Sequence, residues 1–238
     1  MSHLLSFSPS DHPRIKVVHS FEELVSTPFG DGINALCWPR DLPGDFAEVV
    51  RHLSAGEGIT TIVEEMLAGL PLSEAGRTAV EVLIQDQQML REQGLDPILD
   101  CVDGCLRDDD SAIVPTDVYS FHVDSATVEA DTWLCTYAEA SSEGLSNEEA
   151  IRRVDIPETR ALLLEEFGGE DDEAFAEYLA DNCYDLHYLP LPGAQPFSFG
   201  VGNLWRIATQ YPGSPVLPCI HRAPATVPGR PPRLLLIS

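Results

Sequence analysis

Basic residues are scarce in this sequence, and their scarcity limits the partners that the protein can have. The 238 residues include 14 lysines and arginines against 39 acidic residues, which gives a formal net charge of −25. A surface with this charge repels phosphate groups, because like charges oppose association. We therefore expect neither nucleic acid nor an anionic membrane surface among the partners.

Long apolar runs and clustered cysteines are lacking as well. No apolar run approaches the roughly 18 residues that span a bilayer. The first residues, MSHLLSFSPSDHPR, lack the basic start and apolar stretch of a secretory signal peptide. The six cysteines are too few and too scattered for a disulfide framework in a chain of this length. We expect a cytoplasmic protein whose thiols are free and mostly buried.

The common nucleotide-binding and hydrolase motifs are also missing. Gly200-x-Gly202 lacks the third glycine and the strand–helix context of a dinucleotide-binding turn. The sequence contains neither a P-loop nor a G-x-S-x-G nucleophile turn. Any chemistry must therefore come from other side chains.

The first half of the chain is predicted to be mainly helical. Asp45 and Ser73 are placed to cap helices, and apolar residues recur at three- and four-residue steps over 60–70. Pro97 is expected to begin one more helix. We expect residues 1–112 to form a helical support region.

The second half has the composition of a β-sheet domain. Segments 117–124 and 132–137 are rich in β-branched and aromatic residues. An acidic, helix-forming insertion over 139–181 interrupts the strands; we interpret it as a solvated helix face, with a lid over a site as the alternative. The sequence thus predicts an α+β fold in a single domain, 1–238, with its β core in 113–238.

The most informative segment contains His122-x-Asp124. On a strand, residues two apart point to the same face, about 7 Å apart at their Cα atoms. The pair alone is weak evidence, but His221 lies in a late strand-like segment and supplies a third candidate ligand. Two imidazoles and one carboxylate, with coordination positions left open, form the ligand set of non-haem iron(II) oxygenases.

An arginine follows the last of these histidines. Arg233 opens the final predicted strand, and its forked, permanently charged guanidinium suits the distal carboxylate of a dicarboxylate. An arginine at the start of a strand is more often a surface residue. Arg230 is a competing candidate, although its Pro-Gly-Arg-Pro-Pro setting indicates an exposed turn.

The ordered set His122-x-Asp124, His221 and Arg233 resembles the Fe(II)/2-oxoglutarate-dependent oxygenase superfamily. The resemblance covers roughly residues 113–238. It implies a double-stranded β-helix (jelly-roll) core, an iron(II) ion held by the first three residues, and a 2-oxoglutarate co-substrate whose C5 carboxylate binds Arg233. It further implies O₂ and a small-molecule substrate as reaction partners.

Other residues are expected around the same centre. Tyr119 and Thr136 are candidates for lining the co-substrate site, whereas His187 is interpreted as a structural strand histidine. Two other functions remain open: a cupin-like metal enzyme that does not use 2-oxoglutarate, and a non-catalytic jelly-roll binding module. The substrate and the oligomeric state are not readable from the sequence. The candidate substrate contacts are Asn182, Tyr184, Trp205 and Arg222, although packing explains the two aromatic residues equally well.

Overall fold

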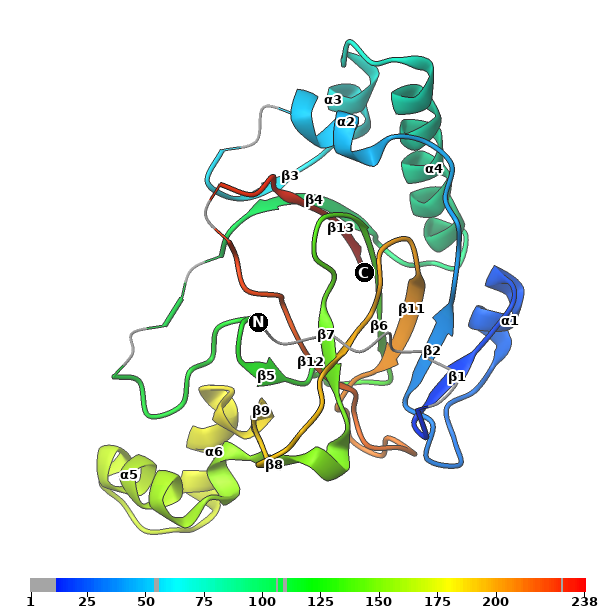
Figure 1. The fold of residues 1–238 in the computed structure, drawn as a ribbon. Coiled ribbons are helices and arrows are strands. Elements are labelled where there is room, and N and C mark those ends of the chain that lie inside the picture. The colour runs from blue at the N-terminus through cyan, green and yellow to red at the C-terminus, as the bar shows by residue number, and fades with distance from the viewer. Residues whose placement is uncertain (1–11, 54–55, 106, 109–110, 228) are drawn as a thin grey trace.

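The protein has a mixed α+β fold built around two β-sheets (Figure 1). The computed structural model describes residues 12–53, 56–105, 107–108, 111–227 and 229–238. The expectation about a signal peptide rests largely on residues 1–11, which lie outside the described residues. No described helix is both long and apolar enough to cross a membrane.

The larger sheet has seven strands and is antiparallel except where β1 pairs with β2. Strand β6 is buried on both faces over most of its length, whereas in β13 buried residues alternate with partly exposed ones. In spatial order the strands are β1 (Ile15–Val17), β2 (Ala35–Trp38), β11 (Leu204–Ala208), β6 (Asp131–Ala138), β13 (Arg233–Ile237), β4 (Ile98–Asp103) and β3 (Gly58–Thr61).

The smaller sheet has six short antiparallel strands, which pack against the larger sheet through Phe197, Phe199, Leu134 and Trp205. Most of these strands have two to four residues, so main-chain pairing with neighbours determines their position more than their own composition does. In spatial order they are β10 (Phe197–Ser198), β7 (Glu143–Leu145), β12 (Ile220–Arg222), β5 (Phe121–His122), β9 (His187–Pro190) and β8 (Ala150–Arg152).

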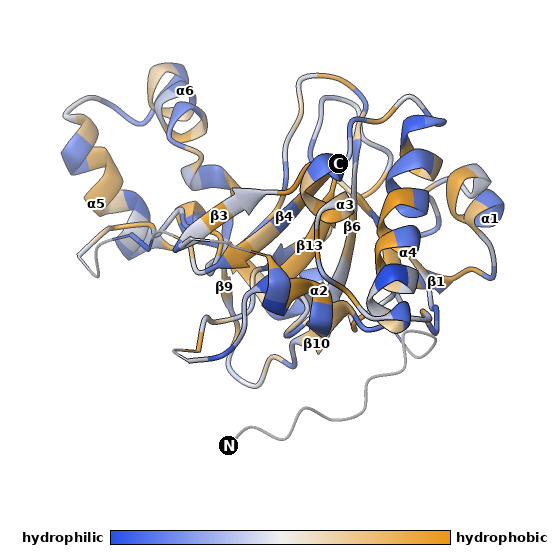
Figure 2. Cartoon of the chain, turned by 90° about the horizontal axis from the view of Figure 1, so that it is seen from above, coloured by the Kyte–Doolittle hydropathy of each residue, from blue (hydrophilic) through white to orange (hydrophobic). Residues whose placement is uncertain are grey.

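Helices from the first half of the chain pack against the larger sheet. The predicted caps are confirmed: Asp45 accepts a hydrogen bond from the Glu48 amide, and Ser73 accepts one from the Gly76 amide. The buried face of the longest helix packs with β6 and β13 in the main hydrophobic core, and its apolar and polar residues alternate along the helix in Figure 2. These helices are α1 (Phe21–Ser26), α2 (Phe46–His52), α3 (Glu64–Ala68) and α4 (Glu74–Arg91).

One predicted helical segment of the first half is shorter than expected, and another is wrong. Gly58–Thr61 is strand β3, so that the helical part of segment 60–70 is only Glu64–Ala68, and no helix begins at Pro97, where β4 follows instead. β4 is paired on both edges, with β3 and with β13. This pairing satisfies its main chain and overrides the weak helical pattern. The first half therefore contributes four strands to the larger sheet as well as its helices.

The acidic insertion is helical only in its second part. Helices α5 (Pro157–Phe167) and α6 (Glu173–Asp181) bear out the prediction and lie at the opposite end of the molecule from α4 (Figures 1 and 2). Residues 139–156 instead supply β7 and β8, with the 3-10 helices η2 (Asn147–Glu149) and η3 (Arg153–Asp155). The strand at Gly144 is fixed by its neighbours, because any added Cβ there would clash with the rings of Phe197 and Phe199.

Candidate metal centre

Two histidines face each other across the middle of the smaller sheet. His122 on β5 and His221 on β12 are direct cross-strand partners, and cross-strand partners carry their side chains on the same face. Phe121 and Ile220, their sequence neighbours, are buried together on the other face. The alternation therefore directs both imidazoles toward the interior between the sheets, where the His221 ring lies 6.4 Å from Phe199.

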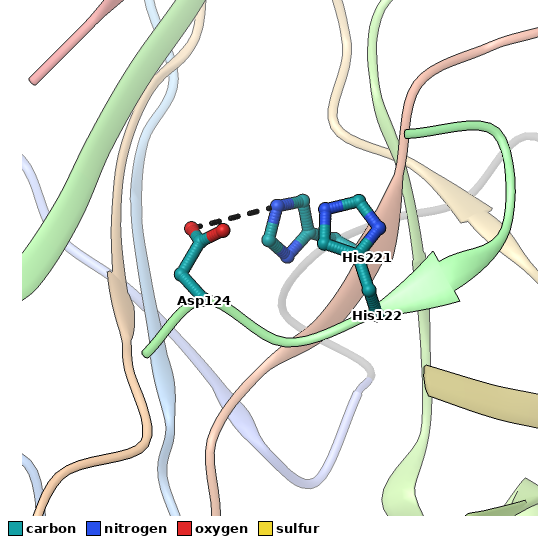
Figure 3. A group of neighbouring side chains, drawn as sticks. All are labelled: His122, Asp124 and His221. Atoms are coloured by element: carbon teal, nitrogen blue, oxygen red, sulfur yellow. Dashed lines mark ion pairs between the residues drawn. The ribbon is translucent and has the colours of Figure 1, made fainter. Parts of the chain in front are cut away.

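Asp124 completes a group of three converging ligands (Figure 3). One donor atom from each of His122, Asp124 and His221 lies within 4.8 Å of the others. The Nε2 atom of His221 is 3.6 Å from a carboxylate oxygen of Asp124, and the two imidazole rings are 4.6 Å apart at their centroids. The structure thus brings together the three residues that the sequence singled out as metal ligands.

Hydrogen bonds hold each ligand in an orientation suited to a metal. Nδ1 of His122 lies 2.8 Å from the Ser120 carbonyl oxygen, and Nδ1 of His221 lies 3.2 Å from the Cys219 carbonyl oxygen. When Nδ1–H donates to a carbonyl, Nε2 keeps its lone pair for the ion. The Thr132 hydroxyl donates to the Asp124 carboxylate and restrains it in the same way.

The charge states of these groups also suit a cation. Burial, followed by the neighbouring His221, lowers the pKa of His122 to about 4. Burial alone would raise the pKa of Asp124, but His221 and the Thr132 hydroxyl outweigh it and hold this pKa below its usual value. At neutral pH the imidazole of His122 is therefore neutral and Asp124 is ionised, which are the forms that ligate metals. The donor set fits iron(II).

A cavity of about 260 Å³ opens beside the triad. His122 and Asp124 line it, together with His187, a residue that the sequence interpretation had treated as structural. His187 is the cross-strand partner of His122 on the side away from His221, and their rings are 5.6 Å apart at their centroids. Only the strand register reveals this neighbour, and register cannot be read from the segment YDLHYLP itself.

Arg233 and Tyr119 line a different cavity, of about 360 Å³. The Arg233 guanidinium donates to the Ala140 carbonyl at 2.8 Å and approaches the Ser142 hydroxyl at 3.4 Å, and no carboxylate of a described residue forms an ion pair with it. Burial lowers its pKa to about 10. Arg230 lines this cavity too, but its exposed side chain lies 3.9 Å from Glu139.

The two remaining co-substrate candidates differ in their surroundings. The Tyr119 hydroxyl is 2.6 Å from the Thr226 hydroxyl and accepts a hydrogen bond from the Cys105 amide, at the rim of the Arg233 cavity. Thr136 is buried in β6 opposite Leu235 and lines neither of the two cavities described above.

The four candidate substrate contacts do not line the cavity beside the triad. Trp205 is buried and stacks on Phe199, with 4.4 Å between the ring centroids. Its indole N–H donates to the Phe199 carbonyl oxygen. Arg222 is paired with Glu143 and lies over the Phe121 ring, on the face of the sheet away from the imidazoles.

Asn182 and Tyr184 follow directly after the helical insertion. The Asn182 amide donates to the Tyr178 carbonyl at the end of α6, and Tyr184 packs edge-on against the Tyr178 ring. The residues next to them in sequence, Cys183 and Leu186, do line the cavity beside the triad. The segment that follows the insertion therefore forms part of the wall of this cavity, through positions that the sequence did not single out.

Comparison with known proteins adds no relative to this picture: no family model matches the chain, and neither the curated proteins nor the solved structures contain a match.

Proposed function

We propose that the protein is a non-haem Fe(II)/2-oxoglutarate-dependent oxygenase that oxidises a small molecule. The observation that carries this proposal is the convergence of His122, Asp124 and His221 beside a cavity. Two imidazoles and one carboxylate occupy one side of an ion and leave the other side for O₂ and organic ligands. Bound iron would supply the activation of O₂, and the protein would orient the substrate and exclude water.

The strand connections support a jelly-roll core for this enzyme. Along the chain, β4, β6, β11 and β13 lie in the larger sheet, while β5, β7, β10 and β12 lie in the smaller one. These eight strands form two four-stranded layers, β4-β13-β6-β11 and β10-β7-β12-β5, as expected of two interlocked Greek keys. The metal ligands lie on the inner face of the smaller layer.

The position of Arg233 supports 2-oxoglutarate as the co-substrate. Its guanidinium is partly buried, lines a cavity and forms no ion pair with a carboxylate of a described residue, so it is available to an anionic ligand. It reaches Ser142, two residues before Gly144, which pairs with His221. Two residues along a strand correspond to about 7 Å. A five-carbon dicarboxylate can span a distance of about 7 Å between the Arg233 contact at Ser142 and the strand position that pairs with His221.

A second function is favoured by one observation. Arg233 and the triad line different cavities in the structure. If these cavities do not join when ligands bind, the same three ligands would serve a cupin-like metal enzyme that does not use 2-oxoglutarate.

Anaerobic titration separates these two functions. The protein is loaded with iron(II), 2-oxoglutarate is added, and the weak visible absorption band of the chelated keto acid is recorded. We expect the band in the native protein and in the control Arg230→Gln, a loss of the band in His122→Ala, and a large increase in the 2-oxoglutarate Kd in Arg233→Gln. Iron binding without any band would support the cupin-like alternative, and the absence of stoichiometric iron binding would exclude both.

A further inference from the structure

The row of histidines continues beyond the metal ligands. His221, His122 and His187 are successive cross-strand partners on β12, β5 and β9, so their side chains share the inner face of the smaller sheet. His187 is 4% exposed, lines the cavity beside the triad and makes no hydrogen bond through Nδ1. A buried polar atom that faces a cavity without a protein partner is available to a ligand.

An arginine extends the same row by one strand. Arg152 on β8 pairs with Tyr188 on β9 in antiparallel register, so the next residue, Arg153, continues opposite His187 at the start of η3. The Nε atom of Arg153 is buried and also lacks a hydrogen-bond partner. Within the described part of the chain, Arg153 Nε and His187 Nδ1 are the two buried side-chain nitrogen or oxygen atoms without a hydrogen-bond partner.

The charge of Arg153 is not neutralised by a neighbouring carboxylate. Asp155, the acidic residue closest to it in sequence, is paired with Arg152 at 2.9 Å, and no ion pair to Arg153 occurs among the described residues. Partial burial lowers the pKa of Arg153, and no counter-ion among the described residues offsets this effect. An anion bound there would satisfy both orphaned atoms.

We propose that Arg153 and His187 bind the carboxylate of the substrate and hold its reactive carbon toward the metal. The substrate is then a small organic or amino acid whose carboxylate lies at the His187 end of the cavity of about 260 Å³, since Arg153 adjoins His187 but is not itself among the lining residues. Adjacent strands are about 4.8 Å apart, so Arg153 lies roughly 10 Å from His122 across two strand spacings. This inference rests on the proposed function in one respect, namely that the bound acid is the substrate of the oxygenase. Binding of the acid at Arg153 and His187 does not depend on it.

Binding of simple acids tests the site directly. The protein is loaded with zinc(II), which keeps the triad filled without redox chemistry, and titrated calorimetrically with butanoate and hexanoate and with the matching primary amides. We expect the acids to bind at least tenfold more tightly than the amides. Arg153→Gln and His187→Leu should each weaken acid binding at least tenfold, whereas Arg152→Gln, a change in the adjacent exposed ion pair, should not. Equal binding of acids by Arg153→Gln and the native protein would overturn the proposal.

Two further measurements make the result specific. His187→Gln retains a side-chain N–H donor and should keep acid affinity within about threefold of native, which separates hydrogen bonding from a packing defect. Manganese(II) in the triad should broaden the proton signals of bound hexanoate, and unbroadened signals would place the acid elsewhere and refute the proposal.

The co-substrate is the competing anion for this site. Titration of the same variants with 2-oxoglutarate should show native affinity in Arg153→Gln and loss in Arg233→Gln. The reverse result would make Arg153 the co-substrate anchor and overturn the inference. Failure of the triad to bind metal would refute the proposed function, while acid binding by Arg153 would still be measurable in the metal-free protein.

Discussion

His122 and His221 are direct cross-strand partners whose rings lie 4.6 Å apart, although 99 residues separate them in the sequence. The two histidine ligands therefore lie on paired main-chain segments, and Asp124 lies two residues beyond the end of β5. A site on paired strands holds its ligands more precisely than a site on loops does.

Removal of one imidazole should abolish tight metal binding. We expect His221→Ala to raise the iron(II) Kd by more than about 100-fold, because a first ligand contributes more than the outer partners, whose loss typically costs 10- to 100-fold. Equilibrium dialysis under anaerobic conditions measures this. His52→Ala, which removes an exposed histidine on α2, is the control. A similar Kd in the two variants would place the metal elsewhere.

The hydroxyl of Thr132 should increase metal affinity by orienting the Asp124 carboxylate. Thr132→Val removes the hydrogen bond that orients this carboxylate, and we expect a loss of roughly 10-fold in metal affinity with an unchanged fold. Thr61→Val is the matched control, since it removes a hydroxyl–carboxylate hydrogen bond to Asp100 at an exposed position. If both variants bind metal like the native protein, Thr132 has no role in orienting Asp124.

Acid should destabilise the metal-free protein before its carboxylates titrate. Burial, together with His221, lowers the pKa of His122 to about 4, and burial, together with Arg153, lowers that of His187 to about 4. An unfolded histidine has a pKa of about 6.5. The unfolded chain therefore binds more protons between these values, and stability falls as the pH drops from about 6.5 to about 4.

Urea unfolding at several pH values measures this dependence. We expect a slope that corresponds to an uptake of at least about two protons on unfolding near pH 5, because burial also lowers the pKa of His12, and a smaller slope in His122→Gln and in His187→Gln. A free energy of unfolding that does not change between pH 6.5 and 4.5 would contradict the burial of neutral imidazoles.

The buried ion pair between Asp86 on α4 and Arg40 should contribute strongly to the free energy of unfolding. Asp86 on α4 pairs with Arg40 at 2.7 Å and accepts a hydrogen bond from the Tyr137 hydroxyl, and Arg40 and Asp86 are almost fully buried. Asp86→Asn leaves the guanidinium without its counter-charge, and we expect a loss of about 3 kcal/mol in the free energy of unfolding. Glu64→Gln, in the exposed pair with Arg91, should cost less than about 0.5 kcal/mol. Chemical denaturation measures both free energies of unfolding. Equal losses in Asp86→Asn and Glu64→Gln would contradict the claim that the buried pair contributes more than the exposed one.

Local signals in the sequence identified the parts of the structure that depend on local chemistry. The caps at Asp45 and Ser73 follow from side chains that bond amides three residues on. These signals require only neighbouring residues. The strand predicted over 117–124 is wrong in extent, because β5 ends at His122 and Asp124 reaches the site from the segment that follows it.

Long-range pairing explains what the sequence did not reveal. β4 and the strand at Gly144 are paired with segments far along the chain, and Gly144 does not itself favour a strand. His187 becomes a neighbour of His122, and Arg153 a neighbour of His187, only through the register of β9 with β5 and β8. A sequence without aligned relatives carries no direct record of such registers.

The most direct test of the central claim is a crystal structure of the anaerobic iron(II)-loaded protein, with anomalous differences collected on both sides of the iron absorption edge. We predict one strong peak within about 2.2 Å of Nε2 of His122, Nε2 of His221 and a carboxylate oxygen of Asp124, with open positions facing the cavity that His187 lines. A peak at other residues, or a closed coordination sphere made entirely of protein ligands, would contradict the proposed oxygenase site.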